Sequence, residues 1–516
     1  MKRDVLLLLL IFAVAIAIVD PRGNMPLDDD WDFAVATWHF AKTGHFSFTP
    51  FTATSLYAQV LWGALWTRLF GASFFVLRCS ILALAALALV VFRALLEKLP
   101  LRPWMRFAAA AALLFHPIFF WSSFTYMTHV PFVFCSVVAA YCYLRGSTGL
   151  GSLAVIASFF IRQTGVVTAI PAVLLARDRK SRMLAAAPLV VFAVVWPILQ
   201  HGESGFHAQP WQAPFHGALY LFDHFSAAAL FVLPLLIPAI ITAPGALGDR
   251  RMVIGAVLLF LARALLFLGF ANPPWDPILT STHLFGNVFT NLGLGPQTLW
   301  DRAMLGYAYP IHLREGMRLP LTLLSAIAGG ILLALVIEKA RKAIAGGQPV
   351  ALRFGVLHLI CASGILAFSQ LWFDRYTIDA TWSLCFVLPL CWPALRSSSS
   401  AARVRQAIAF VALLAFALFD TLAVRDYLQW NRDRGQAWQS LVASGVPPLN
   451  INGGVELNAM ARDPFERPRR NWVIRNDYVL SFNPMDGYDI VQRFGRVYSL
   501  RRRSDTKSPP PTSNWR

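Results

Sequence analysis

Three consecutive acids, Asp28, Asp29 and Asp30, are the residues of this sequence that most clearly call for a chemical role. They follow closely after an apolar run, VLLLLLIFAVAIAIV, which we interpret as an uncleaved first membrane helix. One acid suits the N-cap of a helix that begins near Trp31, but adjacent like charges repel, so capping explains one acid well and three poorly. A carboxylate at the outer mouth of a bundle would otherwise be a general base, a metal ligand or a cation-transport site.

Two arginines in otherwise apolar surroundings are candidates for binding an anion. Arg162 lies in SFFIRQTGVV, where a charge at membrane depth is expensive unless it has a partner or a role. It either extends to the lipid headgroups or binds an anion, because guanidinium bridges phosphate oxygens well. Arg375 lies in LWFDRYTIDATW, and it is either neutralised by its neighbour Asp374 or a second arginine that faces phosphate.

Histidines offer weaker signals. His129, in WSSFTYMTHVPF, is either a structural histidine or a polar contact to substrate. His201, Glu203 and His207 have a metal-like spacing, but no predicted helix aligns them as ligands. We therefore expect no metal site and no cofactor, and a divalent metal has no support in the sequence. The chain also contains no Walker loop, no GxSxG elbow and no dinucleotide fingerprint.

The composition places these residues in a multi-pass membrane protein. Of 516 residues, 57% are hydrophobic and 14% are charged, and the mean hydropathy is +0.55. The formal net charge of +18 would suit a nucleic-acid partner, but the basic residues lie mostly in short loops between apolar segments. That distribution is typical of membrane topology, so no nucleic acid is expected. All six cysteines fall inside apolar segments, and no disulfide framework is predicted.

The apolar runs predict about thirteen membrane-spanning helices, because a crossing needs about 20 apolar residues and shorter runs suffice inside a bundle. The predicted spans are 5–19, 73–95, 105–121, 128–144, 150–162, 164–177, 184–200, 226–245, 252–271, 319–338, 354–372, 377–394 and 405–423. The basic groups then fall on one side, which the positive-inside rule makes the cytoplasm, provided that the chain breaks at Arg162. The acidic loop and the C-terminal tail are consequently predicted to be extracytoplasmic.

The fold class expected is an all-α polytopic membrane protein with a small α/β cap outside the membrane. The first outer loop, residues 20–72, contains the amphipathic stretch SLYAQVLWGALWTRLFG, which is predicted to lie in the membrane interface. The tail is predicted to contain a helix near 425–444, strand-like runs at 472–481 and 488–500, and a disordered end. The predicted divisions are a transmembrane module at 1–423, an extracytoplasmic domain at 424–500 and a disordered tail at 501–516.

Several short motifs, taken in order, resemble the GT-C glycosyltransferases. The resemblance is to the family-39-like branch, which is related to protein O-mannosyltransferases and lipid A aminoarabinose transferase. The motifs are DDDWDFA (28–34), TGHF (43–46), LFGASFFVLR (69–78), TYMTHVPFVF (125–134), IRQTG (161–165), DRY (374–376) and DYVLSFNPMDGY (477–488). No single motif is specific, and it is their order together with the predicted topology that carries the resemblance.

The resemblance implies that a sugar is moved from a polyprenyl-phosphate donor to a hydroxyl of a lipid, glycan or protein acceptor on the extracytoplasmic face. In the family, an acid of the first outer loop deprotonates the acceptor, and the anomeric carbon inverts as the lipid phosphate leaves. The paired acids of the family fall on Asp29 and Asp30, which are the expected catalytic residues. The expected substrate-binding residues are Asp28, His129, Arg162, Gln163, Arg375 and Tyr376.

The sequence departs from the family at two points and leaves other functions open. His129 stands where relatives often carry an acid, and FTATSLY lacks the lysine with which some relatives bind phosphate. The alternatives are a transporter or flippase of a lipid-linked or anionic substrate, and a polysaccharide polymerase or ligase. A transporter would predict inverted repeats and helices broken near the midplane. The outer segments contain no Asn-x-Ser/Thr sequon, which favours a bacterial inner membrane.

Overall fold

The computed structural model describes most of the chain. The residues described are 2–201, 214–242, 249–270, 288–290, 293–296, 299, 318–345, 347–369, 372–392, 400–462, 464–465 and 476–503. The predicted metal-like group at His201, Glu203 and His207 lies outside them, apart from the backbone of His201 at a helix end. The predicted disordered tail lies outside them from residue 504 onward.

The protein is mainly helical, with several apolar helices. Within the described residues, five helices are long and apolar enough to cross a membrane: Phe74–Lys98, Arg179–Leu199, Pro320–Ala343, Val350–Phe368 and Ala402–Ala443. A sixth is added if Pro103–Leu114 and Pro117–Ser123, which are bent by 60° at their junction, form one span. The chain is therefore an integral membrane protein. The predicted total of about thirteen spans also relies on shorter apolar runs, and it stays a prediction.

The first half of the chain is helical over most of its length. Its helices are α1 (Lys2–Val19), α2 (Asp30–Thr43), α3 (Tyr57–Phe70), α4 (Phe74–Leu95), η1 (Leu96–Lys98), α5 (Pro103–Leu114), α6 (Pro117–Ser123), α7 (His129–Leu144), α8 (Thr148–Phe159), η2 (Gln163–Thr168), α9 (Ala169–Leu175) and α10 (Arg179–His201). The predicted break at Arg162 is present, because this residue has extended backbone (φ −142°, ψ 134°) between α8 and η2. The segment that carries Arg162 therefore leaves the helix at this point.

The second half of the chain supplies further helices and the strands. They are α11 (Pro214–Phe231), α12 (Leu233–Thr242), α13 (Arg250–Phe270), β1 (Phe289–Thr290), β2 (Gly293–Leu294), α15 (Arg318–Ile344), α16 (Val350–Gly364), η5 (Ile365–Phe368), η6 (Asp374–Thr377), α17 (Ile378–Val387), η7 (Leu388–Cys391), α18 (Ser400–Ala443), η8 (Pro448–Asn450), β3 (Ile451–Asn452), α19 (Val455–Met460), β4 (Tyr478–Ser481), β5 (Tyr488–Phe494) and β6 (Val497–Arg502).

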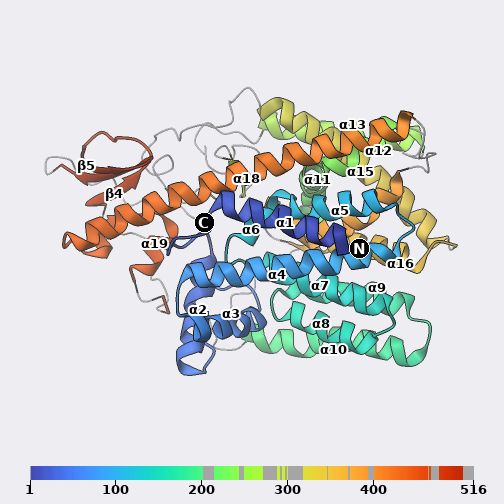
Figure 1. The fold of residues 1–516 in the computed structure, drawn as a ribbon, viewed down its shortest axis with the longest axis horizontal. Helices are drawn as coiled ribbons and strands as arrows, with labels where there is room; N and C mark the ends of the chain where they lie inside the picture. The colour runs from blue at the N-terminus through green and yellow to red at the C-terminus, as the bar shows by residue number, and fades with distance from the viewer. Residues whose placement is uncertain are drawn as a thin grey trace.

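Several long helices, among them α1, α4, α10 and α18, run roughly along the long axis of the molecule (Figure 1). α4 packs on α7, α7 packs on α8, and α18 packs on α1 and α12. The N-terminus lies at one end of this axis, whereas α2, α3, the sheet and the end of α18 lie toward the other end. Since α1 is an 18-residue helix of about 27 Å, it carries the chain from the N-terminus to the acidic loop.

The C-terminal segment is built on α18. This helix runs unbroken from Ser400 to Ala443, so the predicted helix at 425–444 is its final part and the predicted division at 423 falls inside it. In the described tail, the strands form a sheet in the order β3-β4-β6-β5, with β3 and β4 parallel and the other pairs antiparallel. The strands predicted at 472–481 and 488–500 fall on β4 and on β5 with β6.

One face of α3 is apolar and exposed. Leu61, Leu65 and Leu69 are each at least half exposed, while Val60 and Ala64 on the other face are buried. The chain turns at Gly71, whose φ of +92° favours glycine, and enters α4 at Ser73. The Ser73 hydroxyl accepts the N–H of Val76 at 3.1 Å and caps α4. An exposed leucine row of this kind suits the interfacial location predicted for this stretch.

Candidate functional site

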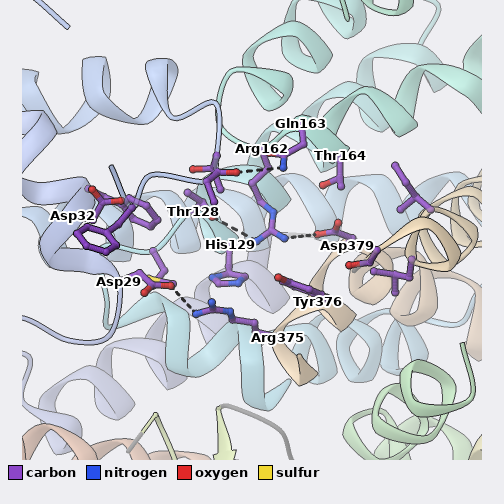
Figure 2. A pocket seen from close by; sticks show the side chains of 18 of the residues that line it. Asp29, Asp32, Thr128, His129, Arg162, Gln163, Thr164, Arg375, Tyr376 and Asp379 are labelled. Carbon is purple, nitrogen blue, oxygen red and sulfur yellow. Dashed lines mark hydrogen bonds and ion pairs between the residues drawn. The ribbon is translucent and has the colours of Figure 1, made fainter. Parts of the chain in front are cut away.

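A cavity of about 380 Å³ lies where four distant segments of the chain meet. The first outer loop contributes Asp29, the start of α7 contributes His129, the α8–η2 junction contributes Arg162, and η6 contributes Arg375. Figure 2 shows these side chains pointing toward a common space. Gln163, Tyr376 and Asp379 line the same cavity. The structure therefore brings together most of the residues that the sequence singled out, namely Asp29, His129, Arg162, Gln163, Arg375 and Tyr376.

Arg375 binds two of the three consecutive acids. Its Nη1 donates to Asp28 Oδ2 at 2.7 Å, and the same nitrogen lies 3.0 Å from Asp29 Oδ2. Asp29 occupies the N-cap position of α2, but its side chain makes no capping hydrogen bond to the described residues of the helix. That side chain is 48% exposed. The Asp29 carboxylate is therefore fixed by an arginine and accessible from the cavity.

Burial and neighbouring charges have opposing effects on the pKa values of Asp28 and Arg375. Burial and the neighbouring Asp29 carboxylate raise the pKa of Asp28, and the Arg375 charge opposes that rise. Burial acts to lower the pKa of Arg375, but the Asp28 and Asp29 carboxylates outweigh it and the pKa is raised. The guanidinium is therefore charged throughout the physiological range, and Arg375 remains a cation on the cavity wall.

Asp30 points away from the cavity. Its carboxylate is fully buried and accepts the N–H of Leu27 at 2.6 Å and that of Tyr126 at 3.5 Å. Burial raises the pKa of Asp30 to about 7, against the opposing charge of Arg78. These contacts make Asp30 the residue that fixes the entry into α2, so the three acids have three different environments.

Asp32 is a cavity residue that the sequence reasoning missed. Its carboxylate accepts the hydroxyl of Thr49 at 2.5 Å and the hydroxyl of Thr52 at 2.9 Å. Burial raises the pKa of Asp32 to about 7, although both hydroxyl groups act to lower it. The signal was present in the sequence, because Asp29 and Asp32 have the i, i+3 spacing that places two residues on one helix face.

Arg162 reaches the cavity from the opposite wall to Asp29 (Figure 2). Its Nη2 lies 3.6 Å from Asp379 Oδ1, and its Nη1 lies 3.5 Å from Thr128 Oγ1. The ring of Tyr376 is within 5.9 Å of the guanidinium carbon. These contacts are long, so the guanidinium is oriented in the cavity but not closely held by any of them.

Arg375 is not paired with its neighbour Asp374, which was one of the two interpretations of the sequence. Asp374 accepts the backbone N–H groups of Val288 and Phe289 at 2.7 to 3.1 Å, which turns it toward β1. The ion pairs of Arg375 are those with Asp28 and Asp29. Neutralisation of Arg375 therefore comes from the first outer loop, a segment nearly 350 residues away in sequence.

Buried arginines hold the first outer loop in place. Arg78, in α4, donates from Nη1 to the carbonyl of Gly23 at 2.8 Å and from Nη2 to the carbonyl of Met25. Arg434, in α18, donates to the carbonyl of Pro26 at 3.1 Å and pairs with Glu456 at 2.8 Å. These arginines fix the segment that leads into the acids.

Glu456 links the tail to the acidic loop directly. Its Oε1 accepts a hydrogen bond from the backbone N–H of Asp28 at 2.8 Å, and its Oε2 accepts one from Arg434 Nη1 at 2.8 Å. Both side chains of this pair are completely buried. Asp28 itself has a φ of +53°, a left-handed conformation that is uncommon outside glycine and asparagine-like residues. The tail therefore helps to hold the strained turn that presents Asp29.

Tyr126 connects α2 and α3 to the turn before α7. Its hydroxyl lies 3.0 Å from the Thr37 hydroxyl and donates to the carbonyl of Gln59 at 2.9 Å. Gln59 Nε2 donates in return to the Tyr126 carbonyl at 2.8 Å. A Cβ at Gly63 would lie 1.9 Å from the Tyr126 hydroxyl, so this close approach requires glycine. The network fixes the position of His129 relative to the acids.

Over the described residues, no three His, Cys, Asp or Glu side chains gather as they would around a metal ion. The polar groups of the cavity are instead carboxylates matched with guanidinium and hydroxyl groups. Such a set can accept a proton on one wall and bind an anion on the other.

Comparison with known proteins gives three solved structures. No protein-family model and no curated protein match the chain. ArnT from Cupriavidus metallidurans bound to undecaprenyl phosphate is 12% identical, covers 96% of this chain and 98% of its own, and gives a TM-score of 0.44. The apo form of the same protein gives 0.40, at 12% identity and with 95% and 97% covered. The archaeal oligosaccharyltransferase AglB from Archaeoglobus fulgidus is 15% identical, with 84% of this chain and 58% of its own covered, at 0.41.

The chain is similar in structure to ArnT and AglB over most of its length. At 12 to 15% identity these matches concern the fold alone, and the GT-C resemblance that the motifs indicate stays a prediction. Because the three TM-scores are below 0.5, the roles of individual residues rest on the geometry of the cavity alone.

Proposed function

We propose that this protein is a glycosyltransferase that moves a sugar from a polyprenyl-phosphate donor to an acceptor hydroxyl. The observation that carries the proposal is the cavity in which an accessible carboxylate, Asp29, shares one space with two guanidinium groups, Arg162 and Arg375. Transfer from a lipid phosphate needs a base near the acceptor and cations near the departing phosphate. The apolar helices place the protein in the membrane, where such a lipid-linked donor resides.

The proposed reaction is a single displacement with inversion. Asp29 takes the proton of the acceptor hydroxyl as its oxygen forms a bond to the anomeric carbon. The bond between that carbon and the phosphate oxygen breaks, and the electron pair leaves with the polyprenyl phosphate. Arg162 and Arg375 stabilise the negative charge that develops on the phosphate. Of the two acids expected to be catalytic, we assign the base to Asp29, because Asp30 is hydrogen-bonded away from the cavity.

The remaining cavity residues are proposed to bind substrate. Gln163 and Tyr376 line the cavity beside the two arginines, and Asp28 holds Arg375 in place. We propose that the acceptor is a lipid, glycan or protein hydroxyl and that the sugar is a hexose or a pentose. No metal or cofactor takes part in the proposed reaction.

The proposed orientation places the cavity outside the cytoplasm. α1 begins at the basic pair Lys2 and Arg3 and delivers the chain to the acidic loop at its other end. By the positive-inside rule, the end of the molecule that carries the loop is then extracytoplasmic. We propose about thirteen crossings, a location in a bacterial inner membrane, and an extracytoplasmic tail domain at 424–500 that is followed by a disordered end at 501–516.

The test is turnover of a panel of polyprenyl-phosphate sugars by the purified protein in lipid, with native membrane extract as the source of acceptors. Asp29→Asn and Arg162→Ala are compared with wild type and with Asp489→Asn, a matched change at an exposed ion pair in β5. Consumption of one donor that is lost in Asp29→Asn but retained in Asp489→Asn supports the proposal. If no donor is consumed while a known transferase is active in the same extract, transport or polymerisation replaces it.

A further inference from the structure

His129 is a buried polar side chain that lines the cavity without a hydrogen-bond partner. Only 1% of the residue is exposed, and neither Nδ1 nor Nε2 bonds to any residue that the structure describes. Buried polar atoms are nearly always hydrogen-bonded, and leaving one unpaired costs about 1–3 kcal/mol. The imidazole is therefore placed to bond a ligand that enters the cavity.

The charges that act most strongly on the His129 ring are those of two guanidinium groups. Its ring lies between the guanidinium groups of Arg162 and Arg375 (Figure 2). Trp121 contacts the ring edge-on, with 6.2 Å between the ring centroids. Two positive charges beside a buried ring oppose a third, so the imidazole is neutral in this arrangement.

The carboxylates of the same cavity are engaged elsewhere. Asp29 is paired with Arg375, Asp379 lies 3.6 Å from Arg162, and Asp32 accepts two threonine hydroxyls. The titratable and charged groups that face the ring from the surrounding elements are Asp29, Asp32, Arg162, Arg375, Tyr376 and Asp379. The potential at the ring is thus set first by the two arginines that flank it.

An anion is the ligand that this arrangement favours. A phosphate ester has several acceptor oxygens and carries one negative charge in the sugar-linked donor and up to two in free polyprenyl phosphate. Guanidinium groups bind both forms strongly. Its arrival would offset the charges of Arg162 and Arg375 and so make a positive imidazole favourable beside it. A neutral sugar hydroxyl would bond the ring as well, but two arginines would not draw it there.

We propose that His129 is a third ligand of the donor's phosphate, beside Arg162 and Arg375, and that it takes up one proton as the phosphate binds. This rests on the function proposed above and adds the position of the phosphate within the cavity. It narrows the expected role of His129 from a polar contact to substrate to a contact with the phosphate. The imidazolium then donates a hydrogen bond to the phosphate oxygens as the bond to the sugar breaks.

The experiment is isothermal titration calorimetry of full-length protein in lipid nanodiscs with polyprenyl phosphate, at pH 7.5, in two buffers that differ in ionisation enthalpy. The difference between the buffers gives the number of protons taken up. Because the second pKa of a phosphate ester is near 6, the free lipid is mostly dianionic at this pH and contributes little. Wild type is compared with His129→Gln and His129→Asn, whose folding is checked by their thermal midpoints. Inorganic phosphate is titrated in parallel.

The expected result is uptake of roughly 0.5 to 1 proton by wild type and close to none by either variant, with binding about 10-fold weaker in the variants. Equal proton uptake in wild type and in both folded variants would overturn the inference and leave the transferase proposal intact. Inorganic phosphate that binds as tightly as the lipid would assign the site to free phosphate instead. Failure of wild type to bind polyprenyl phosphate at all would remove the proposed function together with this inference.

Discussion

Arg375 and Asp29, from opposite parts of the chain, meet at 3.0 Å on the wall of the cavity. The same guanidinium nitrogen holds Asp28 at 2.7 Å, so one arginine orients two of the three consecutive acids. The candidate base is therefore in contact with a candidate ligand of the phosphate. Binding of a phosphate to Arg375 would compete with the ion pair between Arg375 and Asp29. Arg375 therefore contacts both the proposed base and the proposed site of the phosphate.

Replacement of Asp29 by asparagine is expected to reduce sugar transfer by about 10²- to 10⁴-fold, because the amide cannot accept the acceptor's proton. The thermal midpoint should change little, since the Asp29 side chain is 48% exposed. Turnover of the labelled donor and thermal unfolding in detergent measure the two quantities. Transfer within a few-fold of the Asp489→Asn control would show that Asp29 is not the base.

Replacement of Arg162 by lysine is expected to raise the KM for the donor by about 10- to 100-fold, because an ammonium group lacks the planar fork that spans two phosphate oxygens. The matched control is Arg503→Lys, an exposed arginine that pairs with Asp489 at 2.7 Å. Initial rates over a range of donor concentrations separate KM from kcat. An unchanged KM in a folded Arg162→Lys protein would exclude a phosphate contact at this residue.

Thermal stability is expected to fall as the pH rises from about 4 to 7. Asp32 has a pKa of about 7 in the folded protein, against the ordinary value of 3.8. Between these values the folded state holds a proton that the unfolded state has lost, which favours folding at the lower pH by up to about 1.4 kcal/mol per pH unit and carboxyl group. Asp30 acts in the same direction.

The Asp32→Asn variant isolates one of these two contributions. Because the amide does not titrate, the fall in thermal midpoint between pH 5 and pH 7 should be shallower than in wild type. Scanning fluorimetry in detergent at several pH values measures it. A pH dependence identical to that of wild type would mean that Asp32 is already ionised in the folded protein at pH 5.

Replacement of Glu456 by alanine is expected to destabilise the protein by about 3–5 kcal/mol, since it leaves Arg434 buried and unpaired. It also removes the acceptor of the Asp28 N–H, so transfer should decrease even at temperatures where the variant is folded. Denaturant unfolding and turnover are measured side by side. In the double variant Arg434→Leu/Glu456→Leu, part of the lost stability should return, because no buried charge is left unpaired. Full activity of folded Glu456→Ala would show that the tail does not position the acidic loop.

The sequence by itself determined the membrane-embedded helical character, the break at Arg162 and most residues of the cavity. Apolar runs of helical length report directly on a hydrocarbon environment, and a charge within such a run stands out against it. The order of the short motifs was sufficient to indicate a resemblance to GT-C enzymes, which stays a prediction. The i, i+3 spacing of Asp29 and Asp32 could also have identified Asp32 as a residue on the same helix face as Asp29.

Only the tertiary structure decided which acid faces the cavity and which partners each charge has. Asp28, Asp29 and Asp30 are identical in type and adjacent in sequence, yet the first two share Arg375, only Asp29 of the three lines the cavity, and Asp30 accepts the Leu27 N–H. Likewise, the contact of Glu456 with the acidic loop joins residues 428 positions apart. Such pairings depend on how the packed helices bring distant segments together, and no local pattern encodes the partner of a charge.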